Sequence, residues 1–218
     1  MLTYRPQAVI FDLDGLIIDT EVVARSAWQQ SAAELGYQMN DDLYSNFIGR
    51  RTDDCTAKLL EAYGGAFPLS DFLILSDRLC REYLDRHGVP FKPGLHELLD
   101  LLDSRDMTKA VATGSPREDA LLNLGALASR FTLIVGGDEL TRGKPAPEIY
   151  LLTAARLRLA PRQCLALEDA ALGVQAAYAA GMPVIMVPDL YRPSSRIASM
   201  ATGICSSLYE VKDVLAEL

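Results

Sequence analysis

Two aspartates separated by one residue follow the first apolar segment of the chain. Asp12 and Asp14 come directly after residues 8–11, and Gly15 follows them. Carboxylates two residues apart at the end of a strand can face the same way. One can act as a nucleophile and the other as a general acid or base, and both can bind a hard cation. The same residues also suit an ordinary turn, because Asp and Gly are frequent turn residues.

A second polar cluster, Thr113-Gly114-Ser115, follows the apolar residues 110–112. A hydroxyl together with backbone N–H groups at a helix N-terminus forms an anion site. Ser115 also has a purely structural explanation, since Ser115 and Glu118 have the spacing of a helix capping box. Both interpretations stay open from the residues alone.

Two further clusters add a cation and a pair of acids. Lys144 stands between Gly143 and Pro145, where its ammonium can reach a phosphate or a carboxylate, although a solvated loop lysine is equally ordinary. Glu168 and Asp169 follow an apolar segment, and a divalent cation would relieve the repulsion between adjacent buried acids. The alternative is that they complement the dipole of the next helix.

The four clusters are more informative together than singly, because each one follows an apolar segment. The carboxyl ends of parallel strands meet at one edge of a sheet, so the four clusters are expected to face one crevice. Together they supply a nucleophile, a second carboxylate, hydroxyl and N–H donors, a cation and metal ligands. This combination predicts Mg²⁺-assisted phosphoryl transfer.

The apolar segments predict a parallel sheet. Short runs at 8–11, 110–112, 133–135, 165–167 and 184–187 have the unbroken hydrophobicity of strands buried on both faces. Helical patterns separate the later runs; Leu95, Leu98, Leu99 and Leu102, for example, form one apolar face. The alternation predicts an α/β fold, a doubly wound Rossmann-like parallel sheet.

One section interrupts this alternation. Residues 20–87 show helix signals and no strand pattern. We therefore predict two domains: an α/β core formed by 1–17 and 88–218, and an inserted all-helical cap domain at 18–87. An insertion directly after the first strand would lie over the carboxyl ends of the strands, where open α/β sheets bind ligands.

The composition of the chain argues against some classes of binding partner. The 218-residue chain has a formal net charge of −8, which disfavours nucleic-acid binding. We expect no membrane association, because neither a signal peptide nor a stretch of about 18 apolar residues is present. Four widely separated cysteines indicate reduced thiols and a cytoplasmic protein. We expect a monomer or weak homo-oligomer.

The ordered set of motifs resembles the haloacid dehalogenase-like hydrolase superfamily. The resemblance extends over residues 11–21, Thr113, residues 143–147, and Glu168-Asp169 with Gly173. The helical section is similar to the cap of the subgroup that includes β-phosphoglucomutase and many small phosphatases. One position departs from the subgroup pattern, because Ala170 stands where Ser is common.

The resemblance implies a role for each acidic residue. Asp12 would attack phosphorus and form an aspartyl-phosphate, and Asp14 would protonate the leaving oxygen and then activate water. Mg²⁺ would be held by Asp12, Asp169 and the backbone carbonyl of Asp14, with Glu168 as a further or supporting ligand.

The resemblance also implies which residues hold the substrate. Thr113 would act with the N–H of Gly114 on the phosphoryl oxygens, and Lys144 would offset negative charge. The residues that we assign to substrate or phosphate binding are Leu13, Gly15, Gly114, Ser115, Glu21, Arg50, Arg51 and Arg117.

The implied activity is that of a Mg²⁺-dependent phosphatase acting on a small phosphorylated metabolite, a sugar phosphate or nucleotide-like monoester. A phosphoglucomutase-type phosphotransferase is the alternative, disfavoured because Ala24, Ile48 and Thr52 replace residues that serve the mutase. A metal-free dehalogenase would not need Asp14 and the 168–169 pair. A receiver-like signalling module would lack the helical insertion.

Overall fold

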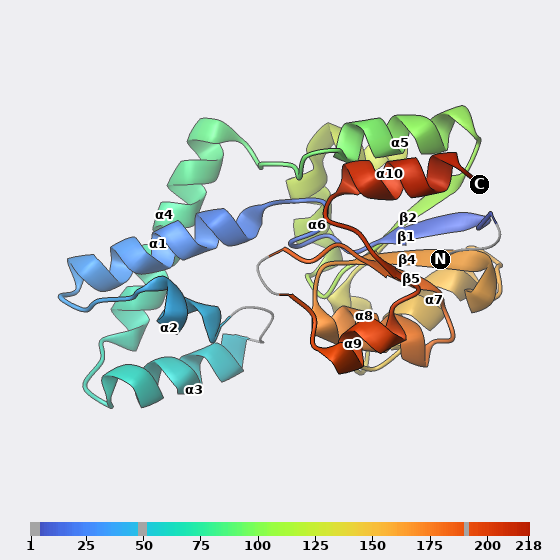
Figure 1. Cartoon of the computed structure of the whole chain (residues 1–218). Coiled ribbons are helices and arrows are strands. Elements are labelled where there is room, and N and C mark those ends of the chain that lie inside the picture. The colour runs from blue at the N-terminus through green and yellow to red at the C-terminus, as the bar shows by residue number, and fades with distance from the viewer. Residues whose placement is uncertain (1–4, 48–51, 190–191) are drawn as a thin grey trace. The chain divides into compact units, whose positions relative to one another are not determined.

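The computed structural model describes residues 5–47, 52–189 and 192–218, and they form two compact units (Figure 1). Unit 1 comprises Met1–Ile18 and Phe91–Leu218, and unit 2 comprises Asp19–Pro90. The chain leaves unit 1 and returns to it at adjacent points, because Ile18 and Phe91 form an antiparallel bridge. Within the described residues, no helix is long and apolar enough to span a membrane.

Unit 1 is built on a parallel sheet in the order β3-β2-β1-β4-β5-β6. The predicted doubly wound α/β fold is therefore confirmed. The chain runs outward from β1 through β2 to β3, and then fills the other side with β4, β5 and β6, so β1 and β4 flank the point where the direction reverses. The strands are β1 (Ala8–Phe11), β2 (Thr108–Ala112), β3 (Leu133–Val135), β4 (Cys164–Glu168), β5 (Val184–Met186) and β6 (Gly203–Ile204).

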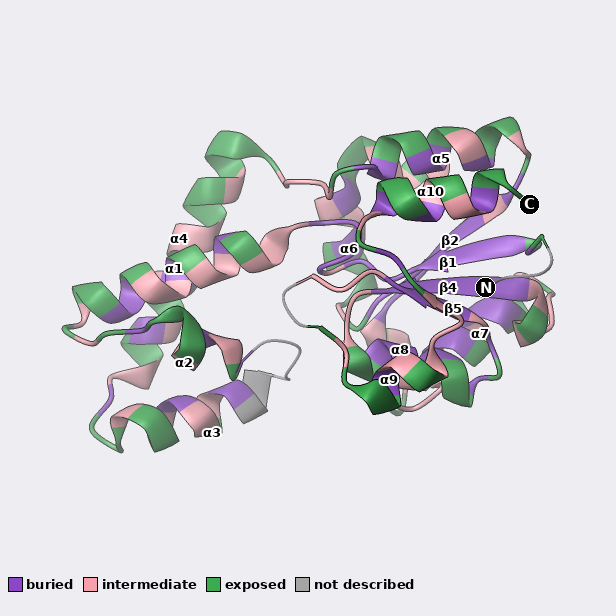
Figure 2. Ribbon diagram, viewed as in Figure 1, coloured by how far each residue is buried: buried purple, intermediate pink, exposed green. Residues whose placement is uncertain are grey.

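Helices cover both faces of this sheet. Helices α5 and α10 pack together over one face, and α7, α8 and α9 cover the other (Figure 1). Figure 2 shows the central strands buried between these layers. The helices of unit 1 are α5 (Leu95–Ser104), α6 (Arg117–Leu124), α7 (Glu148–Arg156), α8 (Ala171–Ala179), α9 (Ser195–Met200) and α10 (Leu208–Ala216), with short 3₁₀ turns at Gly125–Arg130, Gly137–Glu139 and Pro161–Gln163.

Within the described residues, the regular elements of unit 2 are all helices. Its core is an aromatic cluster in which Trp28 contacts the rings of Tyr44, Phe47 and Phe72 at centroid distances of 5.2–5.8 Å. Offset and edge-to-face ring packing of this kind stabilises a small core beyond the area that it buries. The helices are α1 (Thr20–Glu34), α2 (Asp41–Ser45), α3 (Thr52–Tyr63) and α4 (Leu69–His87).

Candidate active site

The register of the sheet places two carboxylates side by side. Phe11 pairs with Leu167 across β1 and β4, so Asp12 and Glu168 occupy equivalent positions at the carboxyl ends of these strands. Side chains alternate between the faces of a strand, and Ile10 and Ala166 belong to the core cluster under α7 and α8. Asp12 and Glu168, two residues further on, share that face.

Lys144 joins the two carboxylates. It lies in the loop before α7, and its Nζ donates to Asp12 Oδ1 at 2.5 Å and to Glu168 Oε1 at 2.6 Å. Its side chain is 14% exposed, so the ammonium is largely removed from water. The solvated-loop interpretation of Lys144 is thus wrong, and its charge is available to offset negative charge at Asp12.

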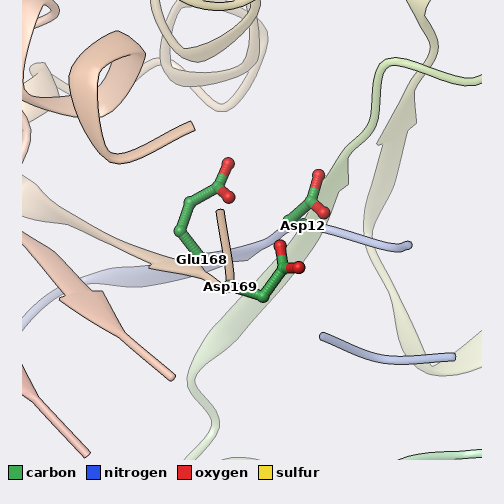
Figure 3. A group of neighbouring side chains, drawn as sticks. All are labelled: Asp12, Glu168 and Asp169. Atoms are coloured by element: carbon green, nitrogen blue, oxygen red, sulfur yellow. The ribbon is translucent and has the colours of Figure 1, made fainter. Parts of the chain in front are cut away.

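Three carboxyl groups gather at this point. Asp12, Glu168 and Asp169 each offer an oxygen, and these oxygens lie within 4.8 Å of one another (Figure 3). Oxygen ligands at this spacing suit a hard divalent cation such as Mg²⁺. The residues present therefore fit the metal that the sequence implies.

The protonation behaviour of the cluster shows unbalanced negative charge. Burial raises the pKa of Asp12 to about 7; Lys144 opposes this shift, and the charge of Glu168 adds to it. Burial, Asp12 and Glu168 also raise the pKa of Asp169 well above its usual range. Burial by itself lowers the pKa of Lys144, but the carboxylates of Asp12 and Glu168 raise it, so the ammonium stays charged. One ammonium among three acids leaves a deficit of positive charge that a divalent cation would fill.

Two glycines shape the walls of the acidic cluster. A Cβ on Gly15 would lie 2.2 Å from Asp169 Oδ2, and the backbone φ of Gly15 is +86°, in the left-handed region that favours glycine. A Cβ on Gly173 in α8 would lie 1.9 Å from the carboxyl carbon of Glu168. Any other residue at these positions would displace a carboxylate.

A second group of polar side chains lies beside the acidic cluster. Asp14 Oδ2 accepts hydrogen bonds from Ser115 Oγ at 2.7 Å and Thr113 Oγ1 at 3.2 Å, and the N–H of Ser115 donates to Thr113 Oγ1. These hydroxyls connect the end of β2 to the loop after β1. Thr113 is completely buried, whereas Gly114 is exposed.

The capping-box interpretation of Ser115 is wrong. Helix α6 begins after Pro116 without a side-chain cap, and the backbone N–H of Arg117 instead donates to Asp138 Oδ1 at 2.8 Å. The Ser115 hydroxyl is engaged by Asp14, which lies far away in the sequence. A carboxylate group can accept a stronger hydrogen bond from a hydroxyl than a neutral backbone group can offer.

The structure gives each of the other predicted substrate residues that it describes a different environment. The side chain of Leu13 is completely buried, so only its backbone is available to a ligand. Arg117 is exposed, and its Nε donates to the carbonyl of Ile134. Glu21 lies in unit 2 and accepts a hydrogen bond from the Tyr44 hydroxyl at 2.8 Å. Arg50 and Arg51 lie outside the described residues.

Tyr150 contacts the acidic cluster, although no sequence pattern predicted this. It is completely buried in α7, and its hydroxyl donates to Glu168 Oε1. Burial, followed by the charge of Glu168, raises the pKa of Tyr150 well above its usual range, so the phenol stays protonated. In the sequence Tyr150 is one apolar position among others in a helix, and only the packing of α7 against the sheet reveals its partner.

Comparisons with known proteins find relatives that cover most of this chain. A phosphorylated carbohydrates phosphatase of Thermotoga maritima is 34% identical over 182 residues, covering 81% of this chain and 82% of that protein. The β-phosphoglucomutase of Bacillus subtilis is 32% identical over 183 residues, covering 81% of this chain and 80% of that enzyme. A crystal structure of a HAD family hydrolase from Deinococcus radiodurans R1, with bound phosphate and sodium, superposes with a TM-score of 0.81 at 28% identity, covering 97% of this chain and 95% of that one.

The family assignment rests on most of the chain. Residues 9–187 match the profile of the haloacid dehalogenase-like hydrolase family, and that range includes all four polar clusters that follow the strands. The prediction drawn from the motifs is confirmed. The chain belongs to the haloacid dehalogenase-like hydrolase family.

Proposed function

We propose that this protein is a Mg²⁺-dependent phosphatase that hydrolyses a small phosphorylated metabolite through an aspartyl-phosphate on Asp12. The observation behind the proposal is the contact of Asp12 with Lys144 beside Glu168 and Asp169. A carboxylate that attacks a phosphate monoester brings negative charges together, so nearby positive charge is required in the transition state.

In the first step, an oxygen of Asp12 attacks phosphorus and the bond between phosphorus and the ester oxygen breaks. Asp14 donates a proton to the departing oxygen, so the product leaves as an alcohol. Lys144 stabilises the charge that accumulates on Asp12 and the phosphoryl group. Thr113 and Ser115, with the N–H of Gly114, hold the phosphoryl oxygens, and to do so the hydroxyls must exchange their present bonds to Asp14.

In the second step, Asp14 takes a proton from water, and the water oxygen attacks phosphorus. The bond between phosphorus and Asp12 breaks, inorganic phosphate is released and the Asp12 carboxylate is regenerated. The two steps use Asp14 first as an acid and then as a base, which leaves its protonation state unchanged over the cycle.

Asp12, Glu168 and Asp169, with the backbone carbonyl of Asp14, would hold the metal. When bound, Mg²⁺ supplies positive charge that offsets the charge of the carboxylates and the phosphoryl group. The proximity of the three carboxyl groups and the raised pKa of Asp12 support this part of the proposal.

The substrate class that we propose is a sugar phosphate or a nucleotide-like monoester. A relative at 34% identity is a phosphorylated carbohydrates phosphatase, which supports this class. We propose that unit 2 acts as a cap that discriminates between substrates.

Incubation with p-nitrophenyl phosphate tests the proposal. We expect release of nitrophenolate in the presence of Mg²⁺, and its loss on chelation with recovery when Mg²⁺ is restored. A screen of phosphorylated sugars and nucleoside monophosphates then identifies the metabolite. Activity that is indifferent to chelation, or no activity on any monoester, would contradict the proposal.

A phosphoglucomutase-type phosphotransferase is the second candidate, because a β-phosphoglucomutase is 32% identical to the chain. The two activities leave different products. With β-glucose 1-phosphate as substrate, ³¹P NMR detects inorganic phosphate from a phosphatase and glucose 6-phosphate from a mutase.

We also propose that the protein acts in the cytoplasm as a monomer or weak homo-oligomer. Cys80, Cys164 and Cys205 are free thiols, which is typical of a reducing compartment. Light scattering after size-exclusion chromatography measures the oligomeric state.

A further inference from the structure

A buried phenol contacts the acidic cluster from the side of the core. Tyr150 is the largest fully buried side chain of the described residues, and it lies in α7. Its hydroxyl donates to Glu168 Oε1, the same atom that accepts from Lys144 at 2.6 Å. The Lys144 ammonium also lies 5.5 Å from the centre of the Tyr150 ring, where the ring face attracts a cation.

These contacts fix the orientation of the Glu168 carboxylate. Tyr150 and Lys144 both bind Oε1, and helix α8 at Gly173 leaves no room for the carboxylate to move in that direction. Since both hydrogen bonds fall on one oxygen, the geometry directs Oε2 toward a different ligand. A carboxylate anchored through one oxygen presents the other in a defined position, which is what a metal ligand requires.

The hydroxyl of Tyr150 also affects how strongly Lys144 interacts with Asp12 relative to Glu168. The ammonium bridges Asp12 and Glu168, and Glu168 already receives a second donor from Tyr150. Without that donor, Glu168 would compete more strongly for the ammonium, and Asp12 would lose part of the positive charge beside it. The hydroxyl of Tyr150 therefore acts on both members of the pair through Glu168.

We propose that Tyr150 is a positioning residue that holds Glu168 in the orientation needed for Mg²⁺ binding and keeps Lys144 available to Asp12. This inference rests on the proposed function, since it concerns the same metal site. It assigns the role to the phenolic hydroxyl, and not to the bulk of the ring.

The variant Tyr150→Phe removes only the hydroxyl and keeps the volume of the core. We expect its affinity for Mg²⁺, measured by isothermal titration calorimetry with the metal alone, to fall by about 10-fold, the usual scale for loss of a group that orients a ligand. At a fixed Mg²⁺ concentration, kcat for p-nitrophenyl phosphate falls while KM changes little. Raising the Mg²⁺ concentration restores part of kcat, which a general packing defect would not allow.

Tyr178→Phe is the matched control, because it removes a hydroxyl from a side chain that is 57% exposed in the same unit. Its Mg²⁺ affinity should equal that of the wild type. A Tyr150→Phe protein that binds Mg²⁺ within about twofold of the wild type would overturn the inference.

A second variant keeps the inference testable if Tyr150→Phe does not fold. Glu168→Gln retains the shape of the side chain and removes the charge through which Tyr150 acts. We expect it to weaken Mg²⁺ binding at least as much as Tyr150→Phe. Unchanged Mg²⁺ binding in Glu168→Gln refutes the inference. The wild-type titration separates this inference from the function that it rests on. If the wild type binds no Mg²⁺, the metal-dependent mechanism itself fails. If the wild type binds Mg²⁺ and turns over normally and Tyr150→Phe matches it, only the role of Tyr150 fails.

Discussion

At the scale of single residues, the site is governed by one pair of charges. Asp12 is buried beside two other acids, and Lys144 is the cation that contacts it directly. A buried carboxylate can act as a nucleophile only when nearby positive charge stabilises its ionised form. In the proposed mechanism, Asp12 would therefore depend on Lys144 and on the proposed metal.

Replacing the proposed nucleophile tests this pair. Asp12→Asn keeps the shape of the side chain but removes the attacking oxygen, so we expect kcat for p-nitrophenyl phosphate to fall by at least about 10⁴-fold. Asp119→Asn, at an exposed position in the first turn of α6, serves as the control and should retain full activity. An active Asp12→Asn enzyme would exclude the aspartyl-phosphate mechanism.

The glycine in α8 offers a second test at this scale. Gly173→Ala places a methyl group 1.9 Å from the Glu168 carboxyl carbon, so the carboxylate must leave its position. We expect activity to fall by about 10- to 100-fold, together with a lower Mg²⁺ affinity. Gly65→Ala, where a Cβ meets nothing within 4 Å, is the control. Equal activity of the two variants would show that the position of Glu168 is unimportant.

At the scale of elements, an ion pair connects a helix to the sheet. Lys109 of β2 is 7% exposed and donates to Asp103 at the end of α5, which also accepts from Arg130. An ammonium so far removed from water depends on its partner, whereas pairs between exposed groups contribute little. The contact helps to fix α5 against the sheet on the face away from the acidic cluster.

Removing the carboxylate of Asp103 leaves the Lys109 ammonium without its charged partner. We expect Asp103→Asn to lower the free energy of unfolding by about 1–3 kcal/mol, measured by urea denaturation. Asp100→Asn should change the free energy of unfolding by less than about 0.5 kcal/mol. The side chain of Asp100 is 71% exposed, and its ion pair is with Arg130 and not with the buried Lys109. Equal effects of the two variants would show that burial of Lys109 adds nothing.

The same pair predicts a pH dependence of stability. The hydrogen bond from Lys109 lowers the pKa of Asp103, and the bond from Arg130 acts in the same direction. A carboxyl whose pKa is lower in the folded state stabilises the fold above its unfolded pKa of about 3.9, and loses that effect as the pH falls through the folded value. The difference in unfolding free energy between wild type and Asp103→Asn should therefore be constant near pH 7 and shrink below about pH 4. A difference that grows on acidification would reverse the assigned sign.

The elements themselves followed from the sequence to a large extent. Unbroken apolar runs predicted the five longer strands, since parallel strands covered on both faces need little else. The two-residue strand Gly203–Ile204 has no such pattern, and Ile204 is exposed. Its place at the edge of the sheet comes from pairing with β5, which no local signal reveals.

At the scale of the whole molecule, the insertion is attached at adjacent points. The N–H of Lys92 donates to the carbonyl of Ile17, and the N–H of Asp19 donates to the carbonyl of Pro90. The two connections thus run beside each other as the chain leaves unit 1 and returns. Asp12, Glu168 and Asp169 all belong to unit 1, so the proposed metal site does not draw on the insertion for its carboxylates.

Deletion of residues 20–89 tests whether unit 1 binds the metal and unit 2 selects the substrate. A short Gly-Ser linker would join residues 19 and 90. We expect the shortened protein to bind Mg²⁺ with unchanged affinity, because its carboxylate ligands are retained. It should lose the ability to discriminate between phosphorylated sugars and p-nitrophenyl phosphate, as measured by the ratio of their kcat/KM values. Retention of full discrimination would contradict the proposed role of unit 2 as a cap.

The sequence by itself determined the family, the parallel sheet and the set of chemical groups, because these depend on residue types and on hydrophobic patterns along the chain. Asp12, Thr113 and Asp169 could be named from their positions after apolar segments, and Lys144 from its place in the ordered set of motifs. The tertiary structure decided which groups share a partner: Lys144 between Asp12 and Glu168, Ser115 bound to Asp14 in place of a helix cap, and Tyr150 on Glu168. Such pairings depend on the register of neighbouring strands and on the packing of α7 against them, and contacts across so many residues leave no trace in local sequence patterns.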